Sequence, residues 1–154
     1  MKGMLSASRK LLMALLSVCV FTLAIQSIAH ANEEASAPIK IPDTVAGVWA
    51  AVDEHTVAID KLIASNQLTI IHSHAFAIRD LIKALPGLSS NLSSDQVAVV
   101  KRDSGYVDQL AVRLDKTGDA DDKDATVTSF NKLQKILGQI RANYNPIPNS
   151  ANNK

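Results

Sequence analysis

Residues 68–85 read LTIIHSHAFAIRDLIKAL, and this stretch decides the fold. Its apolar residues recur at intervals of three and four, which places them on one face of an α-helix. Pro86 and Gly87 follow at once and end the expected helix. The stretch is therefore predicted to be an amphipathic helix that packs within a bundle. Its apolar face consists of Leu68, Ile71, Ala75, Ile78, Ile82 and Leu85.

Three further stretches show the same spacing of apolar residues. Their starts carry side chains that cap helix N-termini, and the clearest start is the capping box formed by Ser93 and Gln96. Four amphipathic helices joined by short connections predict an all-α protein, an antiparallel up-down-up-down four-helix bundle. No alternating pattern of strands competes with this interpretation. The expected helices cover residues 43–66, 68–85, 93–118 and 119–146.

The N-terminus has the pattern of a secretory signal peptide. Lys2, Arg9 and Lys10 precede an apolar run at residues 11–25, and Ala29-His30-Ala31 is a small-residue cleavage pattern. The run is shorter than the roughly 20 apolar residues that a membrane span needs, and no later segment could span a bilayer. Cleavage after Ala31 predicts a periplasmic protein. The expected organisation is a signal peptide at 1–31, an extended leader at 32–42, the bundle at 43–146 and a disordered tail at 147–154.

Composition after cleavage argues against several classes of function. The chain has 16 basic and 15 acidic residues, and loss of the three basic residues in the signal peptide leaves 13 basic against 15 acidic. A weakly acidic domain is a poor partner for nucleic acid or for an anionic membrane surface. The only cysteine, Cys19, and all three methionines lie in the removed segment. The mature chain is therefore expected to have no disulfide, no sulfur ligand for a metal and no haem.

Motifs of catalytic chemistry are absent from the sequence. There is no serine elbow and no phosphate-binding glycine loop, and Asp53-Glu54-His55 is not a zinc-protease motif. We therefore do not expect an enzyme, and the informative residues are the polar ones that interrupt apolar faces.

His55 interrupts the apolar face of the first expected helix, and Asp103 interrupts that of the third. At about 1.5 Å of rise per residue, the two lie at similar heights in the predicted bundle. If they meet in the core, Asp103 would raise the pKa of His55 and hold its ring, or would bond to one ring nitrogen and so orient the other toward a metal. The alternative is that His55 is partly exposed and Asp103 turns to solvent beside Arg102.

His72 and His74 also suggest a metal site. Residues two apart on a helix differ by about 200° in direction, so these rings cannot easily share one ion. Each could still bind a metal with a residue of a neighbouring helix, such as His55 or Glu54. The candidate ligands are therefore His55, His72 and His74, and such a set suits zinc, nickel or copper(II) rather than copper(I). Ordinary surface histidines are the alternative.

The acidic run at residues 115–124 does not match the calcium-binding EF-hand loop. Gly118 is not at the required sixth position, and no glutamate closes the loop. Carboxylates near a helix start are favoured by the helix dipole, so we interpret the run as capping the last helix. Phe76 points away from the main apolar face, where it would mark a partner surface or be covered by the connection after Pro86.

Three segments resemble a known group of proteins. They are HAFAIRDLIKALP at residues 74–86, YVDQLAVRLDKTGDADDKD at 106–124 and LGQIRANYNP at 137–146. Together they resemble small exported all-helical proteins of bacteria found beside heavy-metal or copper efflux systems, over residues 45–146. The resemblance implies a periplasmic location, an envelope or efflux protein as partner, and histidines near the second helix, where His72 and His74 lie. The absence of Met and Cys from the mature chain departs from what soft-metal binding requires.

Two functions are expected on this basis. The first is a periplasmic helical binding protein that is accessory to transition-metal handling or efflux. The alternative is a metal-free partner-binding or structural module of the cell envelope, which would use the face around Phe76 and Arg79. A metal binder should lose its ligand at mildly acidic pH as histidines protonate, whereas a helical adaptor should not.

Overall fold

The computed structural model describes residues 39–144 of the chain. It contains four α-helices, and no strand occurs within these residues. The predicted all-α, four-helix fold is confirmed. The predicted signal peptide, most of the leader and the tail lie outside the described residues. The elements are α1 (Val45–Ala64), η1 (Leu68–Ile70), α2 (Ile71–Ala84), η2 (Leu85–Leu88), α3 (Ser94–Asp119) and α4 (Lys123–Ala142).

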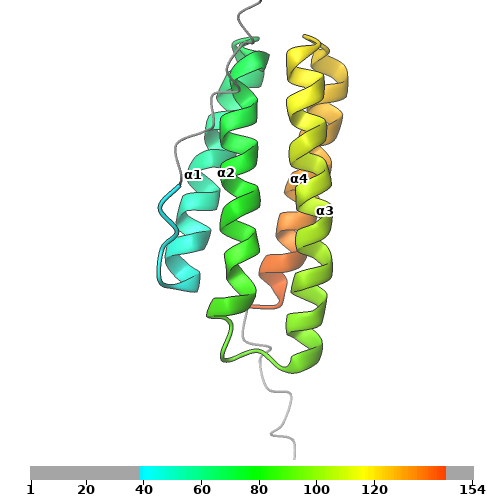
Figure 1. The fold of residues 1–154 in the computed structure, drawn as a ribbon. Coiled ribbons are helices and arrows are strands. Elements are labelled where there is room, and N and C mark those ends of the chain that lie inside the picture. The colour runs from blue at the N-terminus through cyan, green and yellow to red at the C-terminus, as the bar shows by residue number, and fades with distance from the viewer. Residues whose placement is uncertain (1–38, 145–154) are drawn as a thin grey trace, which may run out of the picture. The chain divides into compact units, whose positions relative to one another are not determined.

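The helices lie side by side, with α2 next to both α1 and α3, as Figure 1 shows. Lys83, at the end of α2, pairs with Asp108 in the middle of α3, whereas Leu68, just before α2, lies against Gly118 near the end of α3. These contacts show that α2 and α3 run antiparallel. Helix α3 also packs along α4, while the contact between α1 and α4 is much less extensive.

Side-chain caps fix where the helices begin. The first helix was expected to start at Asp43 or Thr44, and the Thr44 hydroxyl accepts a hydrogen bond from the Gly47 amide at 3.1 Å. The predicted capping box is confirmed, because Ser93 and Gln96 each accept a hydrogen bond from the other's backbone amide. These bonds satisfy donors that the first turn of a helix would otherwise leave free.

The second helix differs from its predicted range at both ends. Only Ile71–Ala84 is α-helical, and short 3-10 turns, η1 and η2, stand on either side of it. Pro86 accounts for the second turn, because it lacks the amide hydrogen that an α-helix needs and tolerates the first positions of a new turn. The tighter 3-10 turns are a common way to end an α-helix.

The core is formed by one apolar face from each helix. The apolar face predicted for residues 68–85 is buried in it, and the partly buried side chains packed against the core include Val45, Leu62, Leu110, Ile136 and Tyr144. Ile39 and Ile41, which precede α1 in the chain, pack against the same core. None of the helices in residues 39–144 combines the length and apolar character that crossing a membrane requires. The largest fully buried side chains include Val48, Val52, Ile59, Leu68, Ile71, Ile78, Leu81, Ile82, Leu85, Leu114, Leu133 and Ile140.

Gly118 gives a test of how closely η1 approaches α3. A Cβ atom at this position would lie 2.5 Å from the carbonyl oxygen of Leu68, and a backbone atom cannot easily move away. We expect Gly118→Ala to lower the free energy of unfolding by about 1–3 kcal/mol, although alanine is normally the better helix former. Urea denaturation measures this change.

Gly105→Ala is the matched control, because its added Cβ meets nothing within 4 Å. This variant should be more stable than the original protein by roughly 0.5–1 kcal/mol. Equal stabilisation by both alanines would contradict the close approach at Gly118.

Candidate functional site

The structure brings His55 of α1 and His74 of α2 into direct contact. Their Nδ1 atoms lie 2.9 Å apart, and the ring centroids are 5.2 Å apart with a tilt of 52°. A hydrogen bond between two Nδ1 atoms needs one nitrogen with a hydrogen and one with a free lone pair. At least one of the two histidines is therefore neutral in this contact.

Burial keeps both rings in the neutral form. The pKa of His55 is lowered from its ordinary value of 6.5 mainly by burial, and the negative charge of Glu54 opposes this shift in part. The pKa of His74 is lowered by burial and then by the neighbouring His55, again with partial opposition from Glu54. At neutral pH the pair is uncharged, which is the state in which imidazole nitrogens bind metals.

Asp103 does not join His55, contrary to the pairing considered from the sequence. Its side chain is buried, and its Oδ1 accepts a hydrogen bond from Nε of Arg102 at 2.8 Å. His55 instead faces α2, since α1 packs against α2 far more than against α3. Asp103 thus neither contacts the histidine pair nor turns out to solvent.

His72 points to the opposite side of α2 from His74, toward α3. Its Nδ1 lies 2.8 Å from the carbonyl oxygen of Thr69, and its ring stands beside Asp115 and Asp119. The prediction that His72 and His74 do not face each other agrees with this placement. The two aspartates were interpreted as capping residues, and their approach to His72 was not predicted. Their spacing of four residues, which puts them on one face of α3, was the available signal.

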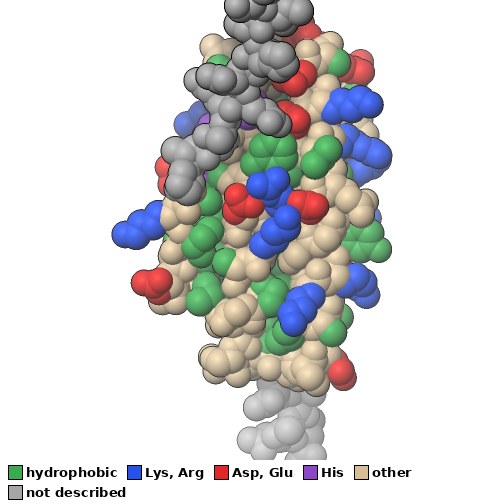
Figure 2. All heavy atoms as spheres, in the orientation of Figure 1, with side chains coloured by type: hydrophobic (Ala, Val, Ile, Leu, Met, Phe, Trp, Pro, Cys, Tyr) green, Lys and Arg blue, Asp and Glu red, His purple; other side chains and the backbone are tan. Residues whose placement is uncertain are grey.

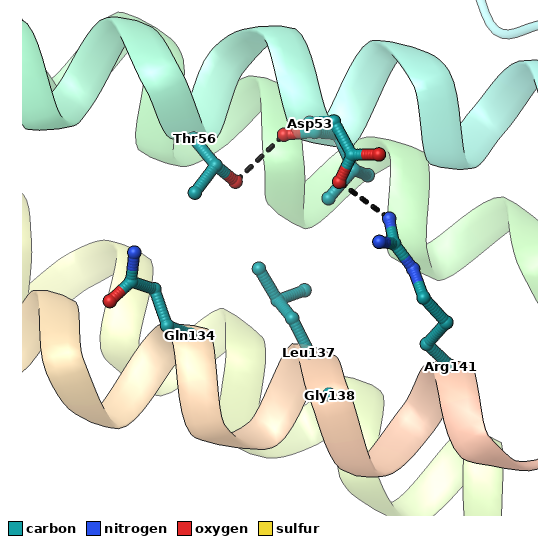
Figure 3. Close-up of a pocket in the computed structure, with 7 residues that line it drawn as sticks. Asp53, Thr56, Gln134, Leu137, Gly138 and Arg141 are labelled. Carbon is teal, nitrogen blue, oxygen red and sulfur yellow. Dashed lines mark hydrogen bonds and ion pairs between the residues drawn. The ribbon is translucent and has the colours of Figure 1, made fainter.

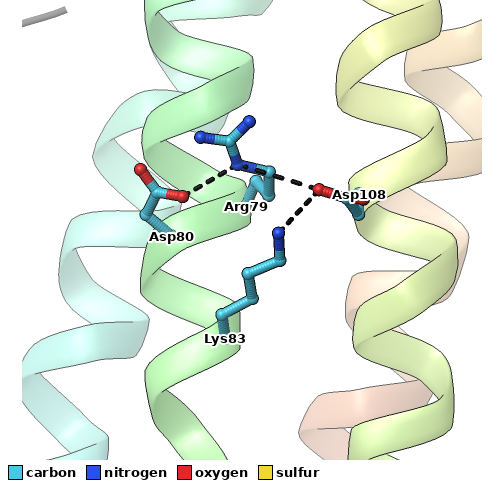
Figure 4. A network of polar contacts seen from close by, with 4 residues as sticks. All are labelled: Arg79, Asp80, Lys83 and Asp108. Atoms are coloured by element: carbon cyan, nitrogen blue, oxygen red, sulfur yellow. Dashed lines mark hydrogen bonds and ion pairs between the residues drawn. The ribbon is translucent and has the colours of Figure 1, made fainter.

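A network of charged side chains lies farther along the face shared by α2 and α3. Arg79 Nε is 2.8 Å from Asp80 Oδ1 and 3.8 Å from Asp108 Oδ1, and Lys83 Nζ is 2.7 Å from the same Asp108 oxygen (Figure 4). Acidic and basic side chains gather at the centre of this face in Figure 2. The Arg79 guanidinium also covers the ring of Phe76 at 4.6 Å. The side chains named for the partner-binding alternative are therefore engaged within the domain.

A shallow pocket of about 180 Å³ lies between α1 and α4 (Figure 3). At one end, Arg141 Nη2 pairs with Asp53 Oδ1 at 2.6 Å, so the two charges offset each other. None of the candidate ligands lines it. The lining residues are Val52, Asp53, Thr56, Gln134, Leu137, Gly138 and Arg141.

Comparison with known proteins adds no functional information, because no family model, curated protein or solved structure matches the chain. The association with heavy-metal efflux stays a prediction from resemblance. The geometry of the histidines is the feature of this chain that bears on its function.

The histidine pair predicts a pH dependence of stability. Because the pKa of each ring is lowered in the folded protein, the unfolded chain binds more protons at pH values near and below 6.5. The free energy of unfolding should be highest above pH 6.5. It should fall as the pH drops below that value toward the folded-state pKa. Urea denaturation at pH 7.5 and 5.5 measures the difference.

The double variant His55→Gln/His74→Gln is the control, because two amides can hydrogen-bond to each other and do not titrate. It should lose less stability between pH 7.5 and 5.5 than the original protein does. An equal loss in both proteins would show that other groups cause the pH dependence.

Proposed function

We propose that the protein binds a divalent transition-metal ion through the imidazoles of His55 and His74, as a helical binding protein of the periplasm. One observation carries the proposal: the two Nδ1 atoms, from different helices, converge to 2.9 Å. Because both rings are neutral, a cation can approach the two nitrogens without repulsion from a charged imidazole. The periplasmic location comes from the predicted signal peptide.

The distance between the nitrogens favours particular metals. An ion about 2.0–2.1 Å from two nitrogens that are 2.9 Å apart makes a nitrogen–metal–nitrogen angle of about 90°. A tetrahedral ion would need the nitrogens about 3.3–3.4 Å apart. The right angle suits the square or tetragonal geometry of copper(II) and nickel(II), and copper(II) binds such ligands more strongly. Copper(II), which binds imidazole more strongly than nickel(II) or zinc does, is therefore the ion we expect at this pair once the two rings have turned so that both lone pairs point to it.

Binding requires a change of tautomer but no net loss of a proton at neutral pH. The ring that donates its Nδ1 hydrogen must carry that hydrogen on Nε2 instead, so that both Nδ1 lone pairs face the ion. Glu54 supplies negative charge near both rings, which favours a cation there. Water would complete the coordination.

A copper(II) titration tests this proposal. The purified protein, without an added histidine tag, is titrated at pH 7.5 in the His72→Ala background, so that the third described histidine does not contribute. We expect one copper(II) per chain, and an electron paramagnetic resonance spectrum with nitrogen hyperfine structure. His55→Ala and His74→Ala should each weaken binding by at least about 10–100-fold, since even outer-shell changes have effects of that size.

Ser73→Ala is the matched control, because it removes a polar side chain from the same turn of α2, where its hydroxyl bonds only to the Ile70 carbonyl. This variant should bind copper(II) as the parent does. If His55→Ala and His74→Ala fold normally by circular dichroism and still bind copper(II) with parental affinity, the pair is a structural hydrogen bond and the proposal fails.

A further inference from the structure

A second group of potential ligands lies at the end of the domain where α2 begins and α3 ends. His72, Asp115 and Asp119 each offer one ligand atom, and these three atoms lie within 4.8 Å of one another. No other set of three histidine, aspartate or glutamate side chains within residues 39–144 meets this criterion. His72 and Asp115 are half-buried and Asp119 is exposed, so an ion could reach the group from solvent on the side of Asp119.

The antiparallel packing of α2 and α3 creates the group. From Lys83 to His72 the chain goes back eleven residues along α2, and from Asp108 to Asp119 it goes forward eleven residues along α3. The same alignment of the two antiparallel helices therefore produces both the ion pair between Lys83 and Asp108 and the approach of His72 to Asp119. Gly118 allows this approach, because any larger residue would collide with the backbone before α2.

The ring of His72 is already oriented for binding. A carbonyl oxygen can only accept a hydrogen bond, so the Nδ1 atom that lies 2.8 Å from the Thr69 oxygen carries the hydrogen. In the neutral ring, Nε2 then has the free lone pair. A histidine that binds a metal through one nitrogen commonly donates its other hydrogen to a backbone carbonyl, which fixes the tautomer and the ring orientation.

Capping does not explain the two aspartates. Asp122 caps α4 by accepting a hydrogen bond from the Ala125 amide at 3.0 Å, and Asp124 lies in the first turn of that helix. Asp115 and Asp119 instead lie in the last turns of α3, where the helix dipole disfavours negative charge. Two carboxylates at the negative end of a helix form a strongly cation-attracting position.

We propose that His72, Asp115 and Asp119 form a second metal site, which binds a divalent ion through one imidazole nitrogen and two carboxylate oxygens. The site is independent of the His55–His74 pair. Its two oxygen ligands suit manganese(II) and zinc, whereas the nitrogen-only pair favours copper(II). Ligand atoms around one ion are about 3.0–3.5 Å apart. The three atoms here lie within 4.8 Å of one another, and rotation of the exposed Asp119 side chain would bring them to that separation. Water occupies the remaining positions.

Manganese(II) is the probe that separates the two sites, because it binds nitrogen ligands weakly and carboxylates well. The purified protein is titrated at pH 7.5, and the loss of the free-ion electron paramagnetic resonance signal measures binding. We expect one manganese(II) per chain. Asp115→Asn, Asp119→Asn and His72→Ala should each reduce the affinity by at least tenfold, while circular dichroism shows the helices retained.

Asp121→Asn is the matched control. It removes one charge from the same acidic run, and asparagine tolerates the positive φ of 52° at this position. This variant and the double variant His55→Ala/His74→Ala should both bind manganese(II) as the original protein does. The proposal is overturned by three results: no saturable binding, equal losses in Asp121→Asn and Asp119→Asn, or loss of manganese(II) with the His55–His74 pair.

The two metal proposals can fail separately. Loss of copper(II) binding in His55→Ala with manganese(II) binding intact supports both sites. Absence of copper(II) binding at the pair, together with manganese(II) binding that depends on Asp119, would leave only the second site.

Discussion

The apolar packing of α2 against both α1 and α3 is the constraint on which the rest of the domain depends. Six residues of α2 are buried. Because residues 39–144 contain no cysteine, no disulfide supports this packing within the described part of the chain. Because the broad apolar face of α2 fills the middle of the interface, its two histidines lie on opposite sides of that face. His74 occupies the edge next to α1 and His72 the edge next to α3. The positions of both candidate sites thus follow from burial of the same face.

Charge is distributed unevenly along the interface between α2 and α3. Near its middle, the carboxylate of Asp108 is balanced by Arg79 and Lys83. At the end marked by Gly118, two carboxylates of α3 meet the half-buried ring of His72, where the helix dipole adds further negative potential. The first arrangement contributes modestly to stability, as exposed ion pairs do. The second places two carboxylates beside a histidine where the interface opens to water.

Local pattern was sufficient to predict the four helices, the capping box at Ser93 and the end of α2 before Pro86. These features depend on residues within a few positions of one another, and helical periodicity reports them directly. The pattern also showed that His72 and His74 point in different directions. Such predictions concern one helix at a time.

The contacts between helices could not be predicted in the same way. Periodicity defines the apolar face of each helix but leaves its rotation against a neighbour undetermined within several tens of degrees. This uncertainty is enough to exchange His74 for Asp103 as the partner of His55. The approach of His72 to Asp119 depends in addition on the register between α2 and α3, which is set by packing and by the small size of Gly118. Residues 47 apart in the chain carry no local signal of such a contact.

Trp49 is the only tryptophan in the sequence, and its place in the fold has a spectroscopic consequence. Its ring is buried, with the guanidinium of Arg141 4.3 Å from the ring centroid and the Tyr144 ring in a T-shaped contact at a centroid distance of 6.2 Å. Its Nε1 has no hydrogen-bond partner among the described residues. Both neighbours come from the end of α4 and the residues just after it. Intrinsic fluorescence excited at the indole band therefore reports whether the last turn of α4 stays docked on α1. It gives an optical signal for the contact between α1 and α4, which is much less extensive than the contacts that α2 makes with α1 and α3.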